Sequence, residues 1–216
     1  MKRVIVFGAS LFASAALLAP AMALAYSAVW VGSTTTPIAV DDASQARGYF
    51  GELAGSPETF AISASEPVRL YVTVLQPQIA GAKQDLSVAV LDPKNPDIPL
   101  GVILGPAASW TPATYEGQAY TKGPEYRATL PAGNYEIRLW STANDAPYVV
   151  VIGETDQNFF ARMKSALSAL PQIDRIFFGR TPAYAIFAPI LLGPLVVALL
   201  IIAAAIWALA VWRFRD

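Results

Sequence analysis

The chain has 216 residues, and its 15 lysines and arginines nearly balance its 16 aspartates and glutamates. Cysteine and histidine are both absent, which excludes disulfides, thiol chemistry, histidine catalysis and metals bound by Cys or His. A near-zero net charge offers no basic face, so we expect no nucleic-acid partner. Any catalysis would depend on carboxylate, lysine, tyrosine or serine side chains.

The first element along the chain is an apolar segment that follows a basic Lys-Arg pair. The run from Val4 to Leu18 is mostly apolar, and small residues follow Pro20 in a pattern that fits the small-x-small cleavage rule. We therefore expect residues 1–25 to be a signal peptide, cut after Ala23 or Ala25. The alternative is an uncleaved anchor, and both versions place the middle of the chain outside the cytoplasm.

Residues 26–154 alternate short apolar runs with clusters of turn residues, which is typical of β-strands. In the clearest run, Val68–Leu75, every second side chain is a core-forming aliphatic residue. Further strands are predicted at residues 59–63, 85–92, 125–130, 135–140 and 148–153. Strands of this length with no helical pattern between them predict a mainly β domain, an antiparallel β-sandwich.

The stretch from Leu91 to Pro124 holds six prolines and shows little periodicity. We expect it to be a long surface excursion, which is where binding residues often lie. Its aromatic residues Trp110, Tyr115 and Tyr120 are our candidate binding patch for a glycan or a protein. The competing interpretation is that these three rings fill the core or pack the loop.

The charged residues give weaker signals. Glu136 and Arg138 fall on one face of the strand at 135–140, and we interpret them as a solvent-facing pair rather than a catalytic one. The neighbouring acids Asp41 and Asp42 do not form a calcium-binding loop pattern, and neither do Asp92 and Asp97. We predict turn roles for Asp92 and Asp97, and no metal site at either pair.

Three motifs recur along the predicted strands: a strand that ends in Asp92–Pro93, an L-P-A-G-x-Y turn at residues 130–135, and a closing strand with Tyr148 and Ile152. In this order the motifs resemble the bacterial pre-peptidase C-terminal domain over about residues 59–153. The resemblance implies a jelly-roll-like accessory domain that binds or assists and does not itself catalyse. No peptidase domain accompanies it in this sequence, and an apolar segment follows instead.

Residues 155–183 form a neck with helical periodicity. Thr155 or Asp156 can cap the helix, and Pro171 is expected to end it. The apolar stripe at helical spacing is Phe159, Phe160, Met163, Leu167 and Leu170. This amphipathic juxtamembrane helix has three possible positions: against its own domain, on the membrane surface, or against a partner subunit.

No charged residue occurs between Tyr184 and Trp212, a run longer than the roughly 20 apolar residues that span a bilayer. We expect residues 184–212 to form a single transmembrane helix, followed by a cytoplasmic tail at 213–216. The residues expected to anchor it at the membrane surfaces are Tyr184, Trp207, Trp212, Arg213 and Arg215. An export signal before it predicts a type I topology in the cell membrane, with the domain on the periplasmic or extracellular side.

These elements lead to three functional hypotheses. The first is a non-enzymatic, membrane-anchored exported β-sandwich that binds an envelope protein or is an accessory subunit of a membrane assembly. Its expected partners are the lipid bilayer and a membrane or envelope protein, and no cofactor is expected. The alternative is a cell-surface carbohydrate- or calcium-binding module, and the third hypothesis is an enzyme that uses acidic residues.

Overall fold

The computed structural model describes residues 26–32 and 36–213. The segment 1–25, where we expect a signal peptide, lies outside the described residues, as does Arg215. The described chain divides into two compact units, one ending at Ala185 and the other beginning at Ile186. The first unit contains all the strands.

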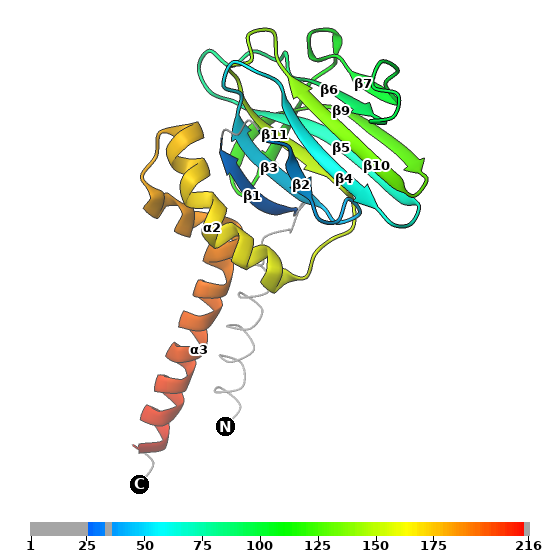
Figure 1. The fold of residues 1–216 in the computed structure, drawn as a ribbon. Helices are drawn as coiled ribbons and strands as arrows, with labels where there is room; N and C mark the ends of the chain where they lie inside the picture. Colours follow the sequence, from blue (N-terminus) through cyan, green and yellow to red (C-terminus); the bar gives the residue numbers. More distant parts are fainter. Residues whose placement is uncertain (1–25, 33–35, 214–216) are drawn as a thin grey trace. The chain divides into compact units, whose positions relative to one another are not determined.

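The first unit is a β-sandwich of two sheets, as predicted (Figure 1). One sheet has six strands, in the order β1 (Ser27–Gly32), β3 (Arg47–Glu52), β11 (Pro147–Ile152), β5 (Val68–Pro77), β9 (Gln118–Leu130) and β8 (Thr111–Tyr115). The other has five strands, in the order β2 (Ile38–Val40), β4 (Glu58–Ala64), β10 (Gly133–Trp140), β6 (Ser87–Leu91) and β7 (Gly101–Ile103).

Both sheets are mixed, whereas the sequence led us to expect antiparallel pairing. β1 pairs with β3 in parallel, and β2 pairs with β4 in parallel. The chain alternates between the sheets over these four strands, so β3 returns beside β1 only after crossing through β2. Such a crossover permits a parallel pair, whereas a tight hairpin joins antiparallel strands.

The alternating residues that we assigned to the sandwich interior do form its core. Leu70, Val72 and Val74 of β5 are buried there, facing Ile137 and Leu139 of β10 across the same hydrophobic cluster. The two-residue period of a strand places every second side chain on the inner face, which is why the sequence pattern predicted this core correctly.

The proline-rich stretch is not the plain surface excursion that we expected, because it contains β7, β8 and the first half of β9. Pro112 is accommodated because β8 lies at a sheet edge, where a missing N–H need not interrupt the ladder. Gly123 and Pro124 are accommodated in a register shift between β5 and β9, where the hydroxyl of Thr73 donates to both of their carbonyls.

The neck forms α2 (Phe159–Phe178), which differs from the predicted helix at both ends. Asn158 caps the helix, and its side-chain oxygen accepts from the N–H of Ala161 at 2.9 Å. Thr155 lies before the cap, where its N–H donates to the carbonyl of Ser44. The helix continues through Pro171 and ends at Gly179, whose φ is +61°. Continuation costs about 3 kcal/mol at a proline, and burial of apolar side chains on both sides of Pro171 offsets it.

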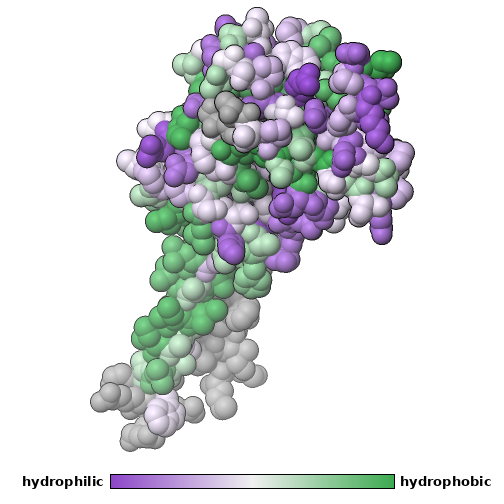
Figure 2. Space-filling model, viewed as in Figure 1, coloured by the Kyte–Doolittle hydropathy of each residue, from purple (hydrophilic) through white to green (hydrophobic). Residues whose placement is uncertain are grey.

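The second unit contains α3 (Pro189–Arg213), which follows the short helix η2 (Pro182–Phe187). Its segment Pro189–Ala210 has 22 residues with a hydropathy of 2.8, and among the described residues it is the helix long and apolar enough to span a membrane. Apolar residues line α3 along the face seen in Figure 2. The side chains of Trp207 and Trp212 are exposed, as interfacial anchors would be.

Candidate functional site

Two of the three aromatic residues in the predicted binding patch are interior residues. Tyr115 is 4% exposed and Tyr120 is 0% exposed. Tyr120 packs edge-on against Phe178 of α2, with ring centroids 5.8 Å apart. Trp110 is partly buried against the sandwich core, where its indole N–H donates to the carbonyl of Gly105 at 3.0 Å. These three residues therefore do not form an exposed patch, and the alternative of core filling is the correct one for the two tyrosines.

Two different contacts bury the tyrosines: α2 covers Tyr120 on the outer face of the six-stranded sheet, and the Tyr26 ring stacks on Tyr115 at a centroid distance of 4.6 Å. Phe177 contacts the rings of Trp30 on β1 and Phe50 on β3 at centroid distances of 5.8 and 6.2 Å. Phe50 in turn contacts Tyr115 at 5.6 Å, and burial raises the pKa of Tyr115 well above its ordinary value. This packing settles the position of the neck helix: α2 lies on its own domain.

A polar contact fixes the end of α2 to β9. The Asp174 carboxylate, 4% exposed, accepts a hydrogen bond from the Gln118 side-chain amide at 3.1 Å. The oxygen of that amide accepts from the Arg180 guanidinium at 2.6 Å. Desolvation raises the pKa of Asp174, and the charge of Arg180 opposes this only in part.

Replacing Asp174 with asparagine should therefore stabilise the domain at neutral pH. A raised folded-state pKa means that ionised Asp174 opposes folding above its pKa, and that this penalty disappears as pH falls and the folded protein takes up the proton. We expect Asp174→Asn to raise the unfolding temperature by about 2–4 °C at pH 7. The difference from wild type should vanish below about pH 4.

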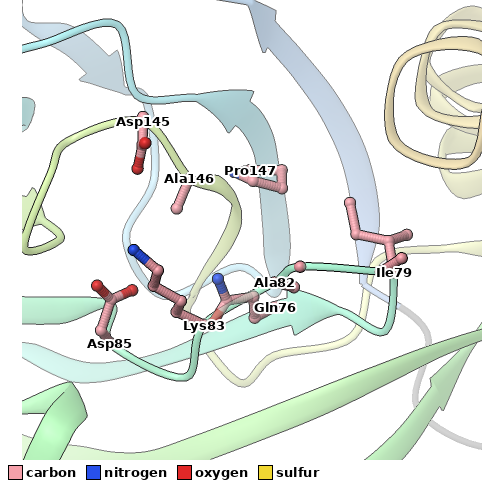
Figure 3. Close-up of a pocket in the computed structure, with 10 residues that line it drawn as sticks. Gln76, Ile79, Ala82, Lys83, Asp85, Asp145, Ala146 and Pro147 are labelled. Atoms are coloured by element: carbon pink, nitrogen blue, oxygen red, sulfur yellow. The ribbon is translucent and has the colours of Figure 1, made fainter.

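One end of the sandwich has a pocket with a volume of about 200 Å³, lined by the β5–β6 loop and the segment that leads into β11 (Figure 3). Gln76 of β5 lies at its base and is 1% exposed. Neither the nitrogen nor the oxygen of its side-chain amide has a hydrogen-bond partner among the described residues. Burying an amide without hydrogen-bond partners costs about 1–3 kcal/mol of folding free energy. Gln76 is therefore the pocket residue best suited to contact a polar ligand.

The rim of the pocket is polar and its walls are apolar. Lys83, Asp85 and Asp145 extend around the opening in Figure 3, with Ala146 and Pro147 on one wall. One oxygen of Asp85 accepts from the N–H of Thr142 at 3.2 Å, and the other is buried with no hydrogen-bond partner in the part of the chain that the structure describes. The pocket thus presents donors and acceptors side by side, an arrangement that suits a small ligand bearing hydroxyl or amide groups.

A second candidate surface lies at the edge of the five-stranded sheet. Among the described residues, β7 ends the five-stranded sheet and pairs with β6 alone. The apolar side chains of Leu100, Val102 and Leu104 alternate along this edge and are all exposed, Leu104 to 55%. Together with Ile98 in the preceding loop, which is 72% exposed, they form what we call the β7 stripe. Exposed apolar residues grouped on an edge strand are typical of a protein contact.

The remaining charged candidates have structural roles. A carboxylate oxygen of Asp42 accepts from both the N–H and the hydroxyl of Ser44. Asp92 accepts from the N–H of Lys94 at 2.9 Å, which confirms its predicted turn role. Arg138 and Glu136 lie 3.7 Å apart on the partly exposed face of β10, which confirms the solvent-facing pair. Within the described ranges, no three acidic side chains come together as a possible metal site.

Comparisons with protein-family models and with curated proteins find no match to this chain. Among solved structures, the chain is similar to the pre-peptidase C-terminal domain of a collagenase from Bacillus anthracis, with 8% identity, 59% of this chain and 94% of that chain covered, and a TM-score of 0.33. It is also similar to CBM35 from Cellvibrio japonicus Abf62, with 17% identity, 62% and 92% coverage, and a TM-score of 0.31. A beta-glucosidase from Paenibacillus barengoltzii matches at 14% identity and a TM-score of 0.29, over 63% of this chain and 14% of its own.

The first of these is the type of domain that the strand motifs resembled. At such identities and TM-scores the likeness does not transfer the function of any of these proteins to this chain.

Proposed function

We propose that this chain is a non-enzymatic, membrane-anchored β-sandwich that binds an envelope protein as an accessory subunit of a membrane assembly. The observation that carries the proposal is the β7 stripe, an apolar surface on an unpaired sheet edge. A partner strand or loop that covers the stripe would remove these side chains from water, at roughly 25 cal/mol per Å² of apolar area. The absence of cysteine and histidine from the sequence supports a binding role over catalysis.

The proposed location follows from the two apolar segments of the chain. α3 is the membrane anchor, and the N-terminal segment has the pattern of an export signal. We place the sandwich on the periplasmic or extracellular side and the four residues 213–216 in the cytoplasm. A cysteine introduced at exposed Asn95 should therefore react with a membrane-impermeant maleimide in intact spheroplasts, and protection of that cysteine would contradict this topology.

The β7 stripe predicts the effect of a single charge on partner capture. Leu104→Asp places a carboxylate in the stripe at a position outside the strand, so the fold should tolerate it. We expect about a tenfold weaker association with co-purified membrane proteins, since a central interface residue costs more than 1 kcal/mol when lost. The measurement is quantitative co-purification of the full-length protein from gently solubilised membranes.

Asn95→Asp is the matched control, because it adds the same charge in the exposed loop before β7 without removing an apolar side chain. It should leave the association unchanged. Equal capture by the wild type and Leu104→Asp, with both folded, would contradict the use of the β7 stripe.

A second candidate function is recognition of a carbohydrate, and the unpartnered Gln76 amide is the observation that favours it. Hydroxyl groups both donate and accept, so a sugar could satisfy both atoms of the amide and the free oxygen of Asp85. The calcium alternative has no comparable support among the described residues.

Replacing Gln76 with methionine separates binding from folding. Methionine has a similar shape and no polar atom, so we expect Gln76→Met to stabilise the unliganded protein by about 1 kcal/mol. It should also abolish any rise in unfolding temperature that a panel of neutral monosaccharides causes in the wild type. Gln78→Met is the control, since that exposed side chain donates to the carbonyl of Tyr120 at 3.1 Å and its loss should be slightly destabilising. A destabilised Gln76→Met would show that the amide has a partner in the folded protein.

A further inference from the structure

The helix α2 has two different faces, and only one of them packs on the sandwich. The inner face consists of small and apolar residues that are buried: Ala166, Ala169, Leu170, Ile173 and Phe177. Phe160 and Leu167, seven residues apart and so on one side of the helix, are instead 74% and 58% exposed. The stripe predicted from sequence therefore does not coincide with the buried face, and two of its large apolar side chains are left in solvent.

The exposed surface of α2 carries only positive charge. Lys164 lies between Phe160 and Leu167 along the helix, and Arg175 follows two turns later; both are exposed. Neither makes an ion pair within the described residues. The single acid of the helix, Asp174, is buried and hydrogen-bonded to Gln118. We call the set Phe160, Lys164, Leu167 and Arg175 the outer face of α2.

Apolar side chains interleaved with lysine and arginine are the composition of helices that lie in a membrane interface. The apolar groups enter the headgroup region, and the cations pair with lipid phosphates there. Phe160 and Leu167 are exposed to water at a cost of roughly 25 cal/mol per Å² of apolar area, which contact with the membrane interface would remove.

The chain itself keeps α2 near a bilayer. Ten residues, 179–188, separate the end of α2 from the start of α3. Six of them form the 3-10 helix η2, which rises about 2 Å per residue, and the other four can extend to about 3.5 Å each. The linker can therefore span at most roughly 26 Å. This is more than one headgroup layer of roughly 5–8 Å and a helix width of roughly 10–12 Å together, so the linker is long enough for α2 to lie on the membrane surface.

We propose that the outer face of α2 docks on the anionic headgroup surface of the bilayer that α3 spans. The helix then has two partners: its inner face holds the sandwich, and its outer face rests on lipid phosphates. This inference rests on the proposed membrane anchoring and is independent of what binds the β7 stripe.

The absence of cysteine makes the test direct. The full-length chain carrying Leu167→Cys is labelled with an environment-sensitive fluorophore and reconstituted in phosphatidylcholine vesicles, with or without phosphatidylglycerol. Asn95→Cys, in the exposed loop before β7, is the matched reporter. We expect the label at position 167 to shift to the blue and to be quenched by lipids with brominated chains several times more strongly than the label at 95, and only when phosphatidylglycerol is present.

Lys164→Gln combined with Arg175→Gln should return the label at position 167 to the emission seen in water, as should high salt. A label at 167 that reports water in both vesicle types, in a chain that sediments with them, would overturn the docking while leaving the anchoring intact. A blue shift that persists in detergent without lipid would also overturn it, because it would mean that a protein covers the face. A chain that does not sediment with either vesicle would remove both the anchoring and the inference.

Discussion

Replacing Phe177 with alanine should cost about 3–5 kcal/mol of folding stability, the largest effect that we expect from a side-chain truncation in α2. Phe177 is buried and contacts the rings of Trp30 and Phe50, so its loss leaves a cavity between the helix and the six-stranded sheet. For a domain of this size the unfolding temperature should fall by about 10 °C. The measurement is thermal unfolding of the full-length protein in detergent, followed by near-ultraviolet circular dichroism.

Phe160→Ala supplies the matched control, since it removes the same ring from the exposed side of the same helix. In detergent it should change the stability by no more than about 0.5 kcal/mol. Equal losses in the two variants would contradict the packing of α2 on the sandwich. If Phe177→Ala alone is destabilising, the contacts of this ring with Trp30 and Phe50 hold α2 on the sandwich.

The sequence was sufficient to predict the parts of the fold that depend on local periodicity. The alternation in Val68–Leu75 placed Leu70, Val72 and Val74 in the core, because neighbours in a strand face opposite sides of a sheet whatever the topology. The same alternation continues to Gln76, which therefore points inward as well. A polar residue in line with core positions indicates a buried polar site, so the sequence alone could have predicted the pocket at Gln76.

Features that depend on distant contacts were not predictable in this way. Pro112 and Pro124 suggested a loop, but an edge strand and a bulge allow both prolines to remain within a sheet. Pro171 suggested a helix end, but packing against β1 and β3 continues the helix past it. For Tyr115 and Tyr120 the sequence left a binding patch and core filling as alternatives, because nothing near Tyr120 in sequence indicates that α2, about forty residues further on, packs against it.

The arrangement of the first unit separates three surfaces by position and chemistry. The β7 stripe is apolar, the Gln76 pocket is polar with mixed charge, and the outer face of α2 is apolar and basic. Each suits a different kind of partner: a protein, a small hydroxylated ligand and an anionic lipid surface. In the proposed arrangement α2 and α3 would hold the domain at a membrane, and the β7 edge would remain available for another protein.

The position of α2 in turn depends on a glycine at the exit from the sandwich. Gly153 follows β11 directly and has a φ of +85°, a conformation that is costly for any residue with a side chain. Its N–H donates to the carbonyl of Tyr71 at 3.0 Å, and the next two N–H groups both donate to the carbonyl of Ser44. An added methyl group would overlap the backbone of Gln45, which lies next to that acceptor.

We therefore expect Gly153→Ala to cost about 3 kcal/mol or more, since backbone strain of about 1–3 kcal/mol adds to a clash with main-chain atoms that cannot rotate away. Gly55→Ala isolates the contribution of backbone strain, because Gly55 has nearly the same φ, +83°, and open space around it. That variant should lose only about 1 kcal/mol. Denaturant unfolding of both variants gives the comparison, and similar losses would mean that the segment at Ser44 and Gln45 moves freely. A larger loss for Gly153→Ala means that the exit from β11 is rigid, and it is this rigidity that directs the chain from the sandwich into α2.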